Sequence, residues 1–155
     1  MLHRPGRRLC AAATAREEWW VHCRVPPGMD RGSMAAALRR VAGMQLSHFV
    51  QMLFYMAVHP DGGHLVRWDA DNRGLCVARS AHRMSAYLGQ FFQSCAQMTF
   101  LRQLSYYNFY QTGKKGADFL VYAHAAFDVT GAELPTIVRG VQGRRSPALV
   151  RSPGK

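Results

Sequence analysis

One short stretch of the sequence combines side chains that could read a nucleic-acid base. Residues 98–107 have apolar side chains at helical spacing, and Arg102 falls on the opposite face of that predicted helix. The polar side chains on or beside this face are Thr99, Gln103, Ser105 and Tyr106. The planar guanidinium of arginine can donate two hydrogen bonds to O6 and N7 of one guanine. Small hydroxyl side chains around it can bind phosphates without blocking its approach.

The charge distribution around this predicted helix is one-sided. No Asp or Glu occurs from Asn72 to Ala117, where an acid would repel a nucleic-acid backbone. The cations in that stretch are Arg73, Arg79, Arg83, Arg102, Lys114 and Lys115. The whole chain carries 20 Lys and Arg against 9 Asp and Glu, a net charge of +11. Such a surplus favours nucleic acid or an anionic membrane surface as partner. At this point a solvated helix face with a lone arginine remains an alternative.

The elements that would position Arg102 can be predicted from periodicity and turn residues. The expected order is helix, strand, strand, helix, helix, strand, strand, over residues 49–57, 64–68, 75–78, 81–92, 98–107, 109–111 and 119–122. Two helices separated by a short break and followed by a hairpin form the layout of a winged helix-turn-helix. We therefore predict an α+β fold, a three-helix bundle against a small four-stranded antiparallel sheet. Trp68, on the first strand, is expected to anchor its core.

Composition divides the chain into three parts. Residues 1–44 hold eight Arg against three acids, with Pro and Gly breakers, and predict a mostly disordered basic leader with one short helix at 34–42. Residues 45–140 are the predicted domain. Residues 141–155 contain four cations and no acid, which predicts a disordered basic tail. No run of 18 apolar residues occurs, so we expect no membrane span.

The residues around Arg102 resemble a known family. Residues 100–109, F-L-R-Q-L-S-Y-Y-N-F, resemble F-V-R-Q-L-N-M-Y-G-F in the DNA-binding domains of heat-shock factors. Residues 49–53, F-V-Q-M-L, are similar to the family's first helix, F-V-Q-K-L, and residues 65–68, L-V-R-W, to its strand L-I-S-W. Residues 124–127 and 133–134 are similar to its H-P-x-F strand and the start of its closing helix.

The resemblance implies a sequence-specific double-stranded DNA-binding protein, a transcription factor of the nucleus. Arg102 matches the arginine that reads guanine in a GAA repeat, and Gln103 and Thr99 match positions that support it through phosphate or water contacts. Lys114 and Lys115 in the predicted hairpin turn, together with Arg139, are expected to attract phosphates only. Neighbouring DNA-bound subunits are a further candidate partner.

Several positions depart from the family pattern. Ser105 replaces Asn, Asn108 replaces Gly, Gln111 replaces a phosphate-binding Lys, and Gly89 replaces Pro. Asn108 suggests a left-handed or capping conformation at the end of the helix. The predicted wing, residues 112–117, is far shorter than the family's, and no heptads follow Arg139, so the family's trimerising coiled coil is missing.

Two other functions remain open at this stage. An ETS-like winged-helix domain would also bind DNA, and Phe119–Tyr122 and Tyr106–Tyr107 resemble its motifs, but ETS helices present two arginines and this helix has only Arg102. Alternatively, the chain is a protein-interaction module that kept the fold and lost base readout, as the changes at Ser105 and Gln111 suggest.

The remaining polar clusters do not predict catalysis or metal binding. Asp69–Gly74 begins like a calcium loop, but its twelfth position is Ser80 rather than the bidentate Glu. No His or Cys pair has the spacing of a helical metal site. We expect no enzyme activity, cofactor, metal or small-molecule substrate.

Overall fold

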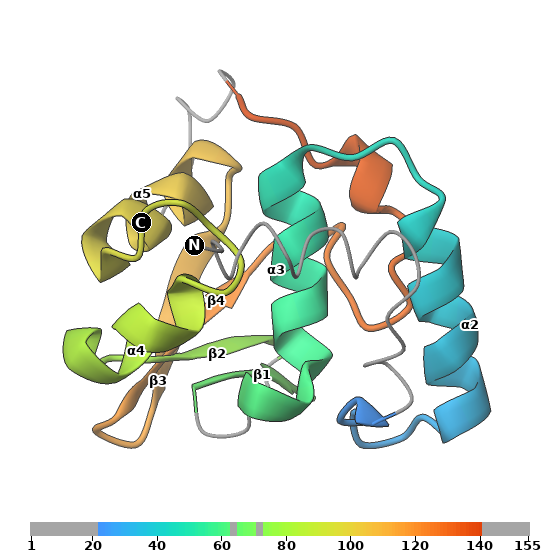
Figure 1. The fold of residues 1–155 in the computed structure, drawn as a ribbon, viewed down its shortest axis with the longest axis horizontal. Coiled ribbons are helices and arrows are strands. Elements are labelled where there is room, and N and C mark those ends of the chain that lie inside the picture. Colours follow the sequence, from blue (N-terminus) through green and yellow to red (C-terminus); the bar gives the residue numbers. More distant parts are fainter. Residues whose placement is uncertain (1–21, 63–64, 71–72, 141–155) are drawn as a thin grey trace, which may run out of the picture.

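The computed structural model describes residues 22–62, 65–70 and 73–140, which form four α-helices and four β-strands (Figure 1). The helices are α2 (Arg31–Ala42), α3 (His48–Val58), α4 (Ala81–Leu88) and α5 (Gln97–Tyr106). The strands are β1 (Val66–Asp69), β2 (Gly74–Ala78), β3 (Tyr110–Lys115) and β4 (Phe119–Ala123). Two short 3₁₀ helices are η2 (Pro60–Gly62) and η3 (Leu134–Thr136). The predicted α+β class and the order of its elements are confirmed.

The four strands form one antiparallel sheet, as predicted, and their order in it is β1-β2-β4-β3. The central strands β2 and β4 pair Cys76 with Val121, and both strands are mainly apolar. β1 and β3 are the edges. A register shift between Gln111 and Gly113 interrupts the β3–β4 ladder. Such a bulge bends an edge strand and changes which face its later side chains occupy.

Helix α3 is the centre of the core. Nine of its eleven residues are buried, which is expected of a helix that is apolar on nearly all sides. Figure 1 shows α3 between α2 on one side and the α4–α5 pair on the other, with the sheet beside it. Ser47 caps its first turn, accepting a hydrogen bond from the main-chain N–H of Val50 at 3.3 Å. This packing gives α4 and α5 a fixed support.

Residues 23–44 differ from the mostly disordered leader that composition predicted. Asp30 caps α2 by accepting from the main-chain N–H of Ser33 at 2.7 Å, and the helix buries one apolar stripe: Met34, Ala37, Leu38 and Val41. The expected helix at 34–42 is therefore three residues longer at its start. This apolar stripe of α2 packs on α3. The segment can therefore fold although it is rich in Arg, because the arginines of α2 lie on the face of the helix opposite the stripe. Residues 1–21 and the predicted tail at 141–155 lie outside the described residues.

Hydrogen bonds join α2 to later parts of the domain. Arg40 Nη2 donates to the main-chain oxygen of Thr130 at 2.7 Å, and Gln51 Nε2 of α3 donates to that of Val41 at 3.3 Å. The predicted bundle of three helices thus has a fourth member.

Trp68 packs against the core, as expected of an anchor, but it is only half-buried. Its ring lies 6.3 Å from that of Phe127, but β1 is an edge strand and leaves one side of the indole open. Within the described ranges, no helix is long and apolar enough to cross a membrane.

Candidate nucleic-acid interface

Helix α5 is fixed at its start by a side chain of its own first residue. The amide of Gln97 donates from Nε2 to the main-chain oxygens of Ala78 and Arg79, at 3.0 and 2.9 Å. The residue at the N-cap of α5, Ala96, makes no side-chain hydrogen bond to the helix. Phe100 and Leu104 are buried beneath the helix. The opposite face of α5, which carries Arg102, therefore faces the solvent.

The end of α5 is shaped by a residue in the left-handed region. Asn108 has φ of +70°, and the next residue, Phe109, donates its N–H to the main-chain oxygen of Leu104 at 3.0 Å. Asparagine tolerates this conformation better than most residues. The turn ends α5 and directs the chain into β3, as the substitution for the family's Gly suggested. The C-terminal segment then returns to this end, where Gly140 N–H donates to Tyr106 O at 3.0 Å.

The structure brings an exposed row of side chains together along α5. Arg102, Ser105 and Tyr106 are all exposed, as predicted from their spacing. Met98 lies one turn before Arg102 on the same face and is 66% exposed. Sequence reasoning missed Met98, although its i−4 spacing from Arg102 was visible. An exposed apolar side chain here could contact a thymine methyl group.

Thr99 and Gln103 occupy a different flank of α5 from this row. Both are half-buried and line a hollow of about 330 Å³ between α5 and the start of α3. Arg139 and His48 line the same hollow, and its aromatic wall includes the stacked rings of Phe49 and Tyr107, whose centroids are 5.1 Å apart. The prediction that Thr99 shares the face of Arg102 is thus only partly right, because the helix turns Thr99 toward the core.

Arg139 is held beside the row by an aromatic ring. Its guanidinium carbon lies 4.7 Å from the ring centroid of Tyr106. Both side chains are exposed, so the cation is presented next to α5. The sequence alone could not bring Arg139 to Tyr106, since the two lie in separate segments of the domain.

The two predicted wing lysines differ from each other in the structure. Lys114 is exposed on β3. Lys115 instead forms an ion pair with Asp69 of β1, with Nζ 3.0 Å from Oδ1, and the Asp69 side chain is only 7% exposed. Lys115 therefore stabilises the sheet and is not at the flexible tip where we expected it.

The face around α5 is free of acids. The described residues from Arg73 to Ala117 contain no carboxylate, so nothing on α4, α5 or β3 opposes Arg102 and Lys114. A helix anchored at both ends, with exposed polar and cationic side chains, can enter a DNA groove. Residues 49–139 match the sequence model of the HSF-type DNA-binding family, which is more than half of the chain.

The chain belongs to the HSF-type DNA-binding family. Sequence-specific binding of double-stranded DNA is therefore its function. The resemblance to heat-shock factors is confirmed, and the ETS alternative is not supported.

Solved structures agree with the family. The chain is similar to Skn7 from Chaetomium thermophilum in a crystal structure with HSE DNA, at 28% identity and a TM-score of 0.55 over 60% of this chain and 100% of that one. A second Skn7 structure, with SSRE DNA, gives 26% identity and a TM-score of 0.55 over 61% and 100%. No curated protein sequence matched the chain. Helix α2 precedes the matched residues, so it lies outside the family match although it packs on α3.

Proposed function

We propose that this HSF-type protein is a transcription factor of the nucleus that reads its DNA site by placing α5 in the major groove. The observation that supports this most is the exposure of Arg102 in the middle of a helix whose two ends are tied to the domain. A side chain that reads a base must be held in a fixed position relative to the groove. The hydrogen bonds at the two ends of α5 fix the position of the helix in the domain, and so that of Arg102.

Arg102 is the proposed base-reading residue. Its guanidinium can donate to both acceptors of one guanine, and Met98, Ser105 and Tyr106 lie along the same face to contact adjacent base edges or phosphates. Ser105 has a shorter polar side chain than the family's Asn, so its contact would be through phosphate or water.

Thr99, Gln103 and Arg139 are proposed to bind the DNA backbone. They converge on the hollow beside α5, where two polar side chains and one cation face the same space. Lys114 adds attraction to phosphate from β3. Lys115 is not part of this proposed backbone contact, because it is paired with Asp69.

The DNA target is proposed to contain a GAA-type repeat. The similar Skn7 proteins were crystallised with HSE and SSRE DNA, which makes duplexes of those two classes the first probes for this chain.

A selection from randomised duplexes tests the proposal. The full chain is expected to enrich a GAA-like motif, and Arg102→Ala is expected to lose preference at one base pair of it. Arg39→Ala is a matched control, because Arg39 is exposed on α2, outside the family match. If the wild-type chain enriched no motif, base readout through α5 would be ruled out, and the interaction-module alternative would be favoured.

A further inference from the structure

One large apolar side chain lies on the exposed face of α5 rather than in the core. Four large apolar or aromatic side chains are exposed in the described part of the chain, and Met98, at 66%, is more exposed than the other three, Tyr106, Tyr110 and Val138. Met98 lies four residues before Arg102, so the two side chains share one face of the helix. A duplex contacted by Arg102 therefore also comes close to Met98.

The first turn of α5 holds Met98 at a fixed place on this face. Met98 is the second residue of α5, and the residue before it, Gln97, donates from Nε2 to the main-chain oxygens of Ala78 and Arg79, at 3.0 and 2.9 Å. Two residues after Met98, Phe100 is buried beneath the helix. The N-terminal residues of a recognition helix are the ones that contact base edges in helix-turn-helix proteins. Met98 is therefore placed where base contacts are made.

The spacing of Met98 and Arg102 determines how far apart their base pairs are. An α-helix rises about 1.5 Å per residue, so the two positions are about 6 Å apart along α5. Base pairs are stacked about 3.4 Å apart, and both side chains lean toward the N-terminus of the helix. Met98 therefore reaches a base pair roughly one or two steps from the guanine proposed for Arg102.

The chemistry of methionine restricts what Met98 can recognise. The side chain has no hydrogen-bond donor, and its sulfur is only a weak acceptor, so it does not read the polar edge of a base. The C5-methyl group of thymine is the apolar group that base pairs present in the major groove. In the proposed GAA-type site, each pair after the guanine has a thymine on the complementary strand. The flexible methionine side chain can adapt to the position of that methyl group.

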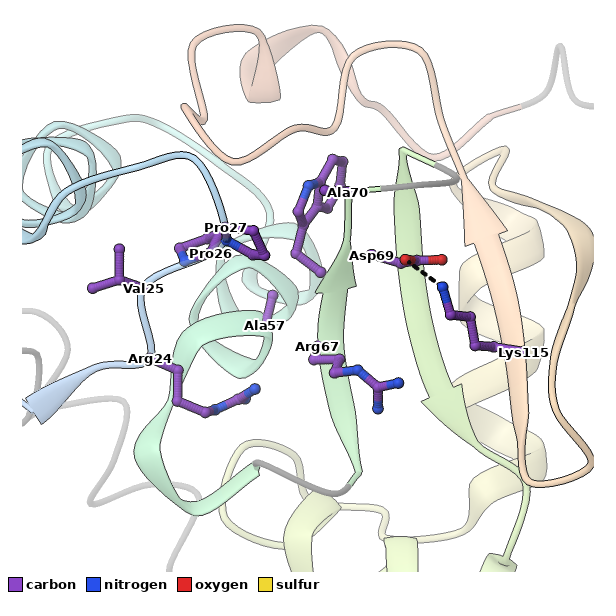
Figure 2. Close-up of a pocket in the computed structure, with 10 residues that line it drawn as sticks. Arg24, Val25, Pro26, Pro27, Ala57, Arg67, Asp69, Ala70 and Lys115 are labelled. Atoms are coloured by element: carbon purple, nitrogen blue, oxygen red, sulfur yellow. Dashed lines mark hydrogen bonds and ion pairs between the residues drawn. The ribbon is translucent and has the colours of Figure 1, made fainter.

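Other side chains near α5 are less suited to this contact. Tyr106 is the last residue of α5, at the other end of the helix, and the guanidinium carbon of Arg139 lies 4.7 Å from its ring centroid. Lys115 of β3 has an apolar stem, but Figure 2 shows it turned toward Asp69 of β1, and their ion pair of 3.0 Å holds it there. Met98 is the exposed apolar side chain at the start of the helix.

We propose that Met98 recognises the C5-methyl group of a pyrimidine within about two base pairs of the guanine that Arg102 contacts. The inference rests on the proposed function, because it requires α5 to lie in the major groove. Thymine and 5-methylcytosine present the same methyl group at the same place, whereas uracil and cytosine lack it. Met98 thus makes DNA binding sensitive to cytosine methylation at this position.

Replacement of single thymines by uracil tests the contact. The full chain is titrated with the duplex enriched by the randomised selection, in which each thymine in turn becomes deoxyuridine; this removes the methyl group and keeps the hydrogen-bonding edge. One replacement near the guanine is expected to weaken binding by about fourfold, which corresponds to about 0.8 kcal/mol for one buried carbon. Uracil at more distant positions is the control and should change affinity by less than about 1.5-fold.

Modified cytosine at the same position tests whether the methyl group, rather than the base, is read. A pair of 5-methylcytosine with guanine is expected to bind within about twofold of the thymine–adenine pair, because Met98 does not read the polar edges. Unmodified cytosine is expected to bind about fourfold more weakly than 5-methylcytosine.

Variants of Met98 assign the effect to this side chain. Gln is similar in length to Met but ends in a polar amide, so Met98→Gln is expected to bind the thymine and uracil duplexes equally. Met98→Leu keeps an apolar group and should retain a preference of about twofold or more. Arg39→Ala on α2 is the control and should keep the full preference. Because Met98 is exposed and both replacements are good helix formers, thermal melts should show unchanged stability.

Three results would overturn the proposal: no effect of uracil at any thymine near the guanine, equal preference for thymine in Met98→Gln and the wild-type chain, or binding of 5-methylcytosine as weak as that of cytosine. A selected motif without a thymine in this region would also overturn it. If the selection enriches a motif and Arg102→Ala loses one base pair of it while uracil has no effect, only this inference fails. If no motif is enriched, the proposed function fails with it.

Discussion

Arg139 lies over the ring of Tyr106, with its guanidinium carbon 4.7 Å from the ring centroid. Tyr106 is the last residue of α5, and its main-chain oxygen also accepts from Gly140 N–H at 3.0 Å. The C-terminal end of the described domain is thus attached to the helix that we place in the DNA groove, and the attachment presents a cation beside it.

Tyr106→Ala and Arg139→Ala are therefore expected to affect DNA binding as a coupled pair. Arg139→Ala should lower affinity evenly across sequences and reduce the salt slope by about one. Tyr106→Ala should lose part of the same effect, because a cation–π contact at an exposed site is worth about 0.5–1 kcal/mol. A double-mutant cycle on a fixed duplex measures the coupling. Strict additivity of the two losses would show that Tyr106 does not position Arg139.

Arg102 and Lys114 are expected to act on different properties of binding. Arg102→Ala should cost about 1–3 kcal/mol on the preferred duplex and flatten preference at one base pair. Lys114→Ala should weaken all duplexes alike and lower the salt slope by about one. Titrations against the selected duplex and its single-base variants at several salt concentrations distinguish the two. A change of sequence preference in Lys114→Ala with none in Arg102→Ala would make β3 the reading element.

Lys115→Ala is expected to destabilise the domain in the absence of DNA. It leaves the carboxylate of Asp69, which is 7% exposed, without its cation, and we expect a loss of about 1–3 kcal/mol in the free energy of unfolding. Lys114→Ala is the matched control: the Lys114 side chain is exposed, so the change should stay within about 0.5 kcal/mol. Urea melts of both variants provide the measurement. Equal stability of the two would mean that the ion pair contributes nothing.

Arg24→Met is expected to weaken the connection between α3 and β1. The Arg24 guanidinium donates to the main-chain oxygens of His59, Met56 and Val66, at 2.7, 3.1 and 2.8 Å. Methionine fills a similar volume but leaves Val66 O without a donor, while His59 O keeps the N–H of Gly62 and Met56 O keeps the hydroxyl of Tyr87, so we expect a loss of about 1–3 kcal/mol. Arg39→Met, on the exposed face of α2, should stay near wild type. An unchanged denaturant midpoint in Arg24→Met would show that water replaces the lost donors.

Stability is expected to fall as the pH drops below the ordinary histidine range. Burial lowers the pKa of His59 and of His124, although Asp61 opposes the shift at His59. In the unfolded chain these groups take up protons near pH ~6.5, before the folded protein does. The contribution is therefore complete above that pH and is lost as the pH falls through the folded pKa values. Urea melts between about pH 7.5 and about pH 5.5 follow it.

His82→Gln provides the control for the pH dependence. His82 is exposed on α4, so its replacement should leave the loss of stability with falling pH unchanged. A wild-type chain that became more stable on acidification would contradict the assignment to buried neutral histidines.

The recognition helix and the sheet could be predicted from the sequence because their signals are local. The spacing of Phe100 and Leu104 defines which face of α5 is buried, and so places Arg102 outward. Strands β1 and β2 follow from short apolar runs on either side of a turn. These elements keep their predicted identity because tertiary packing agrees with local preference.

Two features could not be predicted because each depends on distant parts of the chain. Asp69 is 46 residues from Lys115, and the bulge between Gln111 and Gly113 alters the face on which the later residues of β3 lie. The helix at 34–42 was predicted, but its packing on α3 was not, although Met34, Ala37, Leu38 and Val41 have the i, i+3, i+4, i+7 spacing of a buried face. The arginines around it dominated the average composition of the segment, and an average does not report which face of a helix is apolar.

The hydrogen bond from Arg40 to Thr130 spans 90 residues and has a consequence for synthesis of the chain. A ribosome releases α2 and α3 long before it releases the segment that contains Thr130. When α3 first emerges, α2 is the only other described helix available to cover its apolar faces, and the central pairing of β2 with β4 must wait for residues 119–123. Contacts of such high sequence separation slow folding and prolong the exposure of apolar surface. Because α2 precedes α3 and packs on it, we expect α2 to cover part of α3 in the nascent chain before the sheet can form.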